Sequence, residues 1–69
     1  MINIKLNGDS MVIEAPISLS EFVLQQLKSK EPGGVAVALN EMIIPRQKWK
    51  SVLISENDSV EIVHAVQGG

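Results

Sequence analysis

Apolar and polar residues alternate at the start of the chain, as they do in a strand that buries one face. Ile2, Ile4 and Leu6 are separated by single polar residues, and Asn7-Gly8 follows them directly. That dipeptide favours a tight turn between two antiparallel strands. We therefore predict a hairpin whose second strand runs from about Ser10 to Ala15.

The spacing of apolar residues then changes from two to that of a helix. The apolar positions of this stretch are Leu19, Phe22, Val23 and Leu27. Ser18 and Glu21 have the spacing of a capping box, in which the serine hydroxyl accepts a hydrogen bond from a free backbone amide. The segment Pro32-Gly33-Gly34 cannot continue a helix. The pattern predicts one amphipathic helix from about Ser18 to Ser29.

The third part of the chain is mainly extended. Val35 to Leu39 is an unbroken apolar run, which is typical of a strand covered on both faces or lying at the centre of a sheet. Asn40-Glu41 predicts a turn into Met42 to Ile44. Pro45 cannot donate to a strand ladder, so this next strand should be short or at an edge.

A short helical turn around Trp49 and then an extended piece are predicted within Gln47 to Ser55. Glu56 to Asp58 has the composition of a turn, and a last strand carries Val60, Ile62 and Val63. The order strand, strand, helix and three strands predicts an α+β fold, in which one main helix crosses one face of a mixed sheet of four to five strands. The other face would stay open as a candidate docking surface for a partner.

Composition excludes several classes of function. The 69 residues suffice for one domain, and 45% of them are hydrophobic. A net charge of -2 and 3% aromatic residues give neither the basic field nor the stacking platform of a nucleic-acid-binding protein. There is no cysteine for a disulfide, a catalytic thiol or a cysteine-type metal site. No apolar run approaches the roughly 20 residues that cross a bilayer, and no signal peptide is recognisable, so we expect a cytoplasmic protein that contacts no membrane.

The sequence finishes on Gly68-Gly69, which suggests a tail built to present its own α-carboxylate. Glycine has no Cβ, so a glycine tail can pass through a channel too narrow for side chains. The terminal carbonyl carbon is also unshielded, which suits the close approach that acyl transfer requires. The tail is therefore the predicted functional site.

The chain resembles the ThiS family, the sulfur carriers of thiamin thiazole synthesis. The resemblance rests on Val37 to Asn40, Ile44-Pro45-Arg46, Trp49, Val60-Glu61-Ile62 and the terminal Gly68-Gly69, in this order and spacing. The set separates this chain from molybdopterin carriers, which have a similar shape and tail.

Two positions depart from the family pattern. Asn57-Asp58 stands where the family usually has Gly-Asp before the last strand. Because asparagine tolerates a left-handed backbone conformation, the turn should survive. Gln67 stands where the family more often has a small residue.

The resemblance implies a β-grasp, ubiquitin-like domain over residues 1–66 and a flexible tail over residues 67–69. It implies that a ThiF-type adenylyltransferase uses ATP to adenylate the carboxylate of Gly69. A cysteine desulfurase or another persulfide donor would then supply the sulfur of a thiocarboxylate, which a ThiG-type thiazole synthase would receive. Gly68 and Gln67 would enter the partner's active site. The chain itself would be a cosubstrate with no catalytic residue, bound cofactor or metal.

Other residues have simpler interpretations. Trp49 is expected at the edge of the core, and His64 as an exposed or hydrogen-bonded strand residue rather than a metal ligand. Arg46 could contact a partner or cap nearby carbonyls, and the sequence leaves both open. Alternative functions are a sulfur carrier for molybdopterin or another metabolite, a ubiquitin-like protein modifier, and a simple interaction module.

Overall fold

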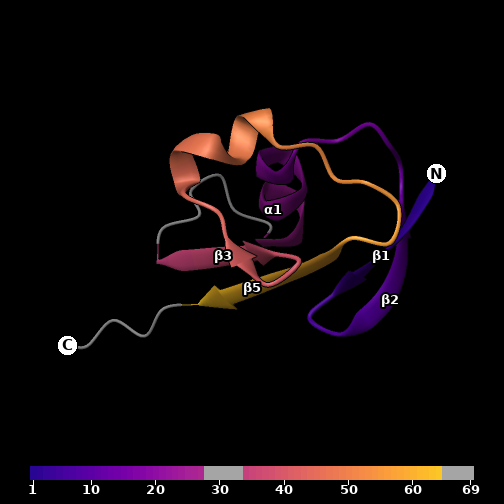
Figure 1. Ribbon diagram of the computed structural model, residues 1–69, viewed down its shortest axis with the longest axis horizontal. Helices are drawn as coiled ribbons and strands as arrows, with labels where there is room; N and C mark the ends of the chain where they lie inside the picture. The colour runs from indigo at the N-terminus through magenta and orange to yellow at the C-terminus, as the bar shows by residue number, and fades with distance from the viewer. Residues whose placement is uncertain (28–33, 65–69) are drawn as a thin grey trace.

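The computed structural model describes residues 1–27 and 34–64 (Figure 1). The elements in chain order are β1 (Ile2–Leu6), β2 (Asp9–Ile13), α1 (Leu19–Leu27), β3 (Val35–Leu39), β4 (Met42–Ile43), the 3-10 helix η1 (Arg46–Ser51) and β5 (Ser59–His64). The five strands form one sheet in the order β2-β1-β5-β3-β4. The β1–β5 pair is parallel and the other pairs are antiparallel. The predicted mixed sheet is confirmed.

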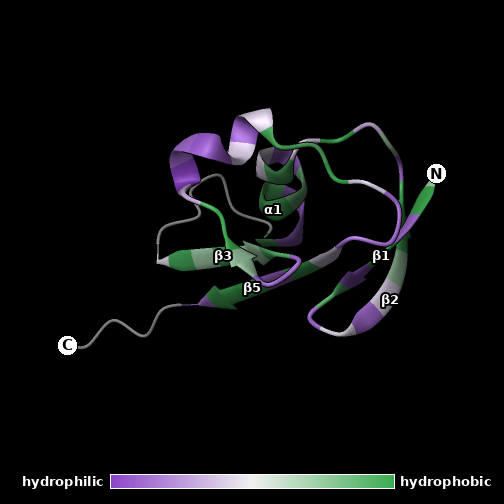
Figure 2. Cartoon of the chain, viewed as in Figure 1, coloured by the Kyte–Doolittle hydropathy of each residue, from purple (hydrophilic) through white to green (hydrophobic). Residues whose placement is uncertain are grey.

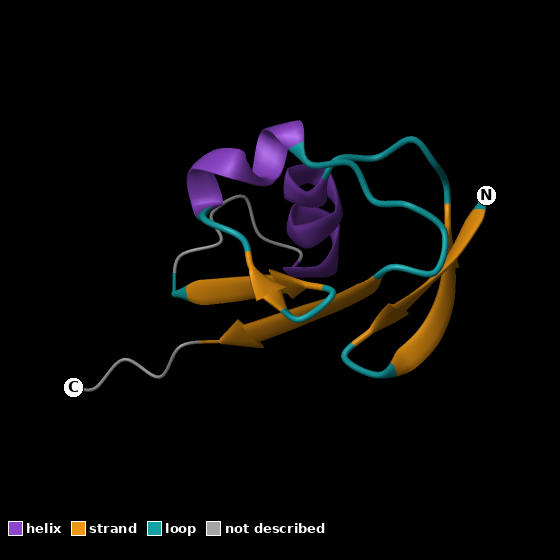
Figure 3. Cartoon of the chain, viewed as in Figure 1, coloured by secondary structure: helices purple, strands orange, loops and turns teal. Residues whose placement is uncertain are grey.

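Both helices lie on one face of the sheet (Figure 3). Leu19, Phe22 and Val23 of α1 are completely buried against it, as their helical spacing predicted. The remaining buried core residues are Ile4, Ile17, Val37, Trp49, Ile54, Val60 and Ile62. The two helices differ in hydropathy, because α1 is largely hydrophobic and η1 is largely hydrophilic (Figure 2). Leu27 at the end of α1 is only partly buried.

The predicted turns are present and share a left-handed backbone. Asn7 and Gly8 have φ angles of 51° and 88°, and Asn40 and Glu41 have 51° and 71°. Positive φ at both central residues is the hallmark of the hairpin turns that Asn-Gly favours. Asn57 has a φ of 68°, so asparagine does take the left-handed position before the last strand.

The helix begins where the sequence predicted. The amide of Glu21 donates to the hydroxyl oxygen of Ser18 at 3.1 Å, which is one half of the predicted capping box. The predicted end near Ser29 and the stop at Pro32-Gly33 fall among residues 28–33, outside the described residues. In the described part of the chain no helix is long and apolar enough to cross a membrane.

Strand β3 differs from one expectation. It lies inside the sheet between β5 and β4, but it is not covered on both faces, because Ala36 is exposed while Val37 is buried. Both described helices lie on the same face of the sheet, so the alanine side chains of β3 that point to the other face are not covered by a helix. The central strand is β5. Strand β2 is also shorter than predicted and ends at Ile13 rather than Ala15.

Trp49 belongs to the core and is buried more deeply than the predicted position at its edge. Its side chain is 3% exposed, and its indole Nε1 donates to the carbonyl of Ile44 at 2.8 Å. This bond satisfies the only polar group of the ring. It also ties η1 to the segment that follows β4, where Pro45 ends the strand.

Candidate functional site

Strand β5 leads into the predicted functional tail. It ends at His64, and residues 65–69 lie outside the described residues. The predictions for Gln67, Gly68 and Gly69, and for a tail beginning at residue 67, therefore stay predictions. What the structure provides is the root of the tail, which we define as Ile62 to His64, and the surfaces beside it.

The root of the tail belongs to the best-supported strand of the sheet. On one edge, β5 pairs with the whole of β3, from Leu39 opposite Val60 to Val35 opposite His64. On the other edge, β1 pairs only with Ser59 and Val60. The carboxyl end of β5 is therefore held continuously by β3, whereas backbone pairing with β1 stops at Val60, near the start of the strand.

The open face of the sheet carries an apolar patch beside this root. The register places Ala36 opposite Val63 and Ala38 opposite Ile43, and alternation along the strands points all four side chains away from the helices. Ile43 is 70% exposed and Val63 is 60% exposed. We call these four residues the open-face patch. The sequence alone does not show which residues of these strands point to the open face.

Arg46 begins η1 and is exposed. Its guanidinium carbon lies 5.4 Å from the centre of the Trp49 ring, within the range of a cation–π contact. Because Trp49 is buried and hydrogen-bonded, the ring is a fixed support for the cation. Lys48 and Lys50 add charge to the same helix, which contains no acidic residue. Figure 1 shows η1 beginning toward the end of the long axis at which β5 finishes.

His64 is exposed at the end of β5. Across residues 1–27 and 34–64, no group of three or more histidine or acidic side chains has a geometry that could hold a metal ion.

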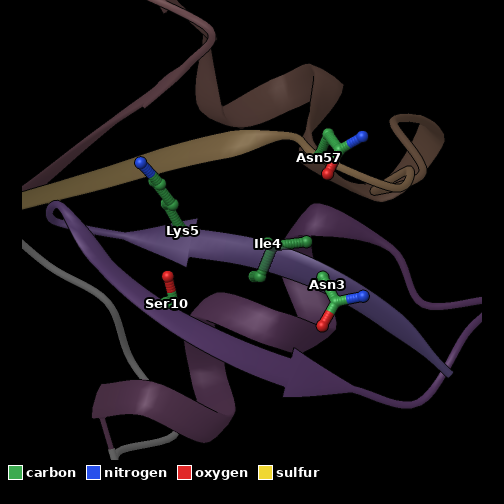
Figure 4. A pocket seen from close by; sticks show the side chains of 5 residues that line it. All are labelled: Asn3, Ile4, Lys5, Ser10 and Asn57. Atoms are coloured by element: carbon green, nitrogen blue, oxygen red, sulfur yellow. The ribbon is translucent and has the colours of Figure 1, made fainter.

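One hollow lies away from the root of the tail. It has a volume of about 270 Å³ and is lined by Asn3, Ile4, Lys5, Ser10 and Asn57 (Figure 4). Asn57 precedes the start of β5, and a six-residue strand is about 17 Å long, so the hollow and the root of the tail lie at opposite ends of β5. Its lining carries amides, one ammonium and one hydroxyl, without a general base.

One carboxylate near this hollow is tied to β1. Glu56 accepts hydrogen bonds from the backbone amide of Asn3 at 3.0 Å and from the Asn3 side chain at 3.1 Å. These bonds, the backbone one first, lower the pKa of Glu56 below its ordinary value. The contact anchors the turn before β5.

A smaller hollow of about 180 Å³ adjoins the root of the tail. It is lined by Leu6, Asn7, Gln26, Leu27, Ile62 and His64. No sequence pattern predicted that Asn7 would line this hollow. Its only signal was the Asn-Gly turn, and the 55 residues between Asn7 and Ile62 hid their proximity.

Solved structures resemble this fold over nearly the whole chain. A crystal structure titled thiamine biosynthesis protein (ThiS) from Geobacter metallireducens has a TM-score of 0.80, with 24% identity over 99% of this chain and 100% of that chain. An NMR structure of a thiamine biosynthesis protein from the same organism has a TM-score of 0.76, with 24% identity over 99% and 88% of the two chains. At this identity the likeness establishes the fold, and the β-grasp prediction is confirmed.

Sequence relatives match over the same length. The ycf40 protein of Pyropia yezoensis is 34% identical over 99% of this chain and 93% of its own length. The sulfur carrier protein ThiS of Escherichia coli is 28% identical over 99% of this chain and 100% of its own length. The model of the ThiS family matches residues 3–69, a range that includes both terminal glycines. The chain therefore belongs to the ThiS family.

Proposed function

We propose that this protein is a sulfur carrier of thiamin biosynthesis and that Gly69 carries the sulfur as a thiocarboxylate. The observation that carries the proposal is the ThiS family match through Gly68-Gly69. The Escherichia coli relative with the name sulfur carrier protein supports it. The chain contains no cysteine, so the terminal carboxylate is the natural place for sulfur to be attached.

The thiocarboxylate forms in three steps, which depend on partner enzymes and a thiol. An oxygen of the Gly69 carboxylate attacks the α-phosphorus of ATP, pyrophosphate leaves, and an acyl-adenylate forms. A persulfide sulfur from a cysteine desulfurase or a similar donor then attacks the acyl carbon and AMP leaves. Reduction of the resulting acyl disulfide by a thiol releases the thiocarboxylate. A ThiG-type thiazole synthase then takes the sulfur and returns the carboxylate.

The surfaces beside the root of the tail suit docking onto a ThiF-type adenylyltransferase. The open-face patch offers uncovered apolar area, and Arg46 presents a cation supported by the Trp49 ring. Arginine and apolar groups at the centre of a contact are the types that contribute most to protein interfaces. In this proposal the partner holds the end of the sheet from both sides, through the open-face patch on one side and Arg46 on the helix-covered side, while Gln67, Gly68 and Gly69 enter its active site.

The intact mass of the chain isolated from growing cells tests the carrier function. A species heavier by the difference between one sulfur and one oxygen is expected in addition to the unmodified chain. Its amount should fall when the persulfide donor is removed. If the chain is instead found joined to lysines of other proteins, the ubiquitin-like modifier is the better assignment.

Variants of the tail test the site. Deleting Gly69 moves the carboxylate back by roughly 3.3 to 3.6 Å, so it should no longer reach ATP, because reacting atoms must lie about 3 to 3.5 Å apart. Gly68→Val keeps the length but adds a β-branched side chain where a narrow channel is proposed. Both variants should fold normally by circular dichroism and lose pyrophosphate exchange with the adenylating enzyme. Near-normal exchange by both would favour a simple interaction module.

The pathway that this carrier serves is tested by offering its thiocarboxylate to different sulfur-accepting enzymes. Thiazole formation with a ThiG-type synthase should consume the thiocarboxylate, whereas a molybdopterin synthase should leave it intact. The reverse result would assign the chain to molybdopterin or to another sulfur-containing metabolite.

A further inference from the structure

Backbone hydrogen bonds from β1 and from Asn7, the residue after it, support β5 only as far as Val60. The backbone amides of Lys5 and Asn7 donate to the carbonyls of Asp58 and Val60, each at 2.9 Å. After Asn7 the chain reverses at Gly8 into β2. The next backbone groups on this edge of β5 are the N–H and C=O of Ile62, at the root of the tail, and β1 has no backbone left to pair with them.

The side chain of Asn7 takes the place of the missing backbone. The amide of Ile62 donates to Asn7 Oδ1 at 2.9 Å, and Asn7 Nδ2 donates to the carbonyl of Ile62 at 3.4 Å. A primary amide offers the same donor and acceptor as a peptide group. The β1–β5 ladder is thus continued by one step toward the tail, through a residue whose backbone has already turned away.

We propose that Asn7 is a positioning residue for the chemistry at Gly69, an inference that rests on the proposed carrier function. By holding Ile62 from the β1 side, Asn7 restrains the edge of β5 that β3 does not pair, close to the point where the strand ends at His64. Without these bonds the last part of β5 is held along its β3 edge alone, which gives it more conformational freedom. That freedom lowers the fraction of docked complexes in which the carboxylate meets ATP at reacting distance. Asn7 should therefore affect turnover more than binding.

A second asparagine provides a matched control at the start of β5. Asn40 also has a φ of 51° and also makes two side-chain bonds. Asn40 Oδ1 accepts from the amide of Ser59 at 2.9 Å, and Asn40 Nδ2 donates to Asp58 Oδ1 at 3.0 Å. Asn7 and Asn40 thus hold two different points of one strand, Ile62 and Ser59, with similar backbone φ angles and two side-chain bonds each. Only Asn7 is next to the root of the tail.

The test compares Asn7→Gly with Asn40→Gly in the full chain. Glycine adopts the left-handed conformation readily, so each variant loses side-chain bonds without straining its turn. Thermal melts should fall by similar amounts. For pyrophosphate exchange with the adenylating partner, Asn7→Gly should lower kcat about tenfold and change KM less than about twofold, since errors of even 1 Å in placement are costly. Asn40→Gly should leave both constants near those of the parent.

Hydrogen exchange separates the contact from its consequence. The hydrogen-exchange rate of the Ile62 amide should be higher in Asn7→Gly than in the parent. In Asn40→Gly this rate should be unchanged. Asn7→Asp keeps the turn and the acceptor for Ile62 N–H but loses the donor to Ile62 C=O, so it supplies a second variant with an intermediate kcat expected.

Several results would overturn the role of Asn7. Equal kcat values for Asn7→Gly and Asn40→Gly would reduce it to a stabilising residue, as would an increase in KM with kcat unchanged. If the parent chain supports no pyrophosphate exchange with the adenylating partner, both the carrier function and this role of Asn7 are overturned. Normal parental exchange with unaffected variants overturns only the positioning role.

Discussion

Three asparagines adopt a backbone conformation that side chains usually disfavour, and each holds β5 or the turn before it. Asn7, Asn40 and Asn57 have φ angles of 51°, 51° and 68°. Their short polar side chains can bond locally, which explains why asparagine tolerates the left-handed region better than most residues. The amide of Asn57 also donates to the carbonyl of Asn3 at 2.7 Å, so the turn before β5 is fastened to β1.

At the same scale, Glu56 should make stability depend on acid pH. Its lowered pKa means that the folded protein favours the carboxylate form. The stabilisation is therefore present above the pKa of the unfolded chain and lost as the pH falls through the lower, folded-state pKa. The Tm difference between the parent and Glu56→Gln should be largest near neutral pH and shrink on acidification. An NMR titration placing the Glu56 pKa at or above that of an unconstrained glutamate would contradict this.

The helix side chains should differ in their contribution to stability according to burial. Leu19 is fully buried and Leu27 only partly. Leu19→Ala should lower the free energy of unfolding by about 2 to 5 kcal/mol, and Leu27→Ala by about 1 kcal/mol because less apolar area is lost. Equilibrium unfolding in urea measures both values. Equal losses would mean that the end of α1 packs as tightly as its start.

At the scale of elements, the turn between β3 and β4 contains a residue that fits poorly. Glu41 has a φ of 71°, a conformation that costs a side-chain-bearing residue about 1 to 2 kcal/mol. Glycine would remove this strain but would add roughly 0.4 to 1 kcal/mol of unfolded-state entropy. Glu41→Gly should therefore stabilise the protein by about 0.5 to 1 kcal/mol.

Thermal melts of Glu41→Gly and Glu41→Ala check this prediction. Alanine removes the same carboxylate but keeps the strain, so it should bring no gain. A gain shared by both variants would show that the charge of Glu41, rather than its backbone conformation, is unfavourable.

At the scale of the whole molecule, one helical layer on a five-stranded sheet leaves the open-face patch available. Ile43→Asp should leave the fold intact, because the side chain is 70% exposed, but should raise KM for the adenylating partner about tenfold, equivalent to about 1.4 kcal/mol of binding. Val12→Asp is the matched control. Val12 is 57% exposed on β2, two strands away from β5, and its variant adds the same charge outside the patch. Equal effects of the two variants would argue against docking through the patch.

The sequence by itself determined the features that depend on neighbouring residues. The Asn-Gly turn, the capping serine, the helical spacing of Leu19, Phe22 and Val23, and the strand-ending Pro45 were all predictable. Each reflects local backbone preferences or the period of one element. The double-glycine tail and the family resemblance were likewise properties of residue order.

Only the tertiary structure decided which distant residues meet. The face of the sheet to which each side chain points depends on the register between paired strands, because a shift of one residue would move every side chain to the other face. The open-face patch depends on the same register. The exposure of Ala36 follows from helices covering a single face. The bonds between Asn7 and Ile62 join residues 55 positions apart. They exist because β1 and β5 lie parallel in the sheet, a pairing that no local pattern specifies.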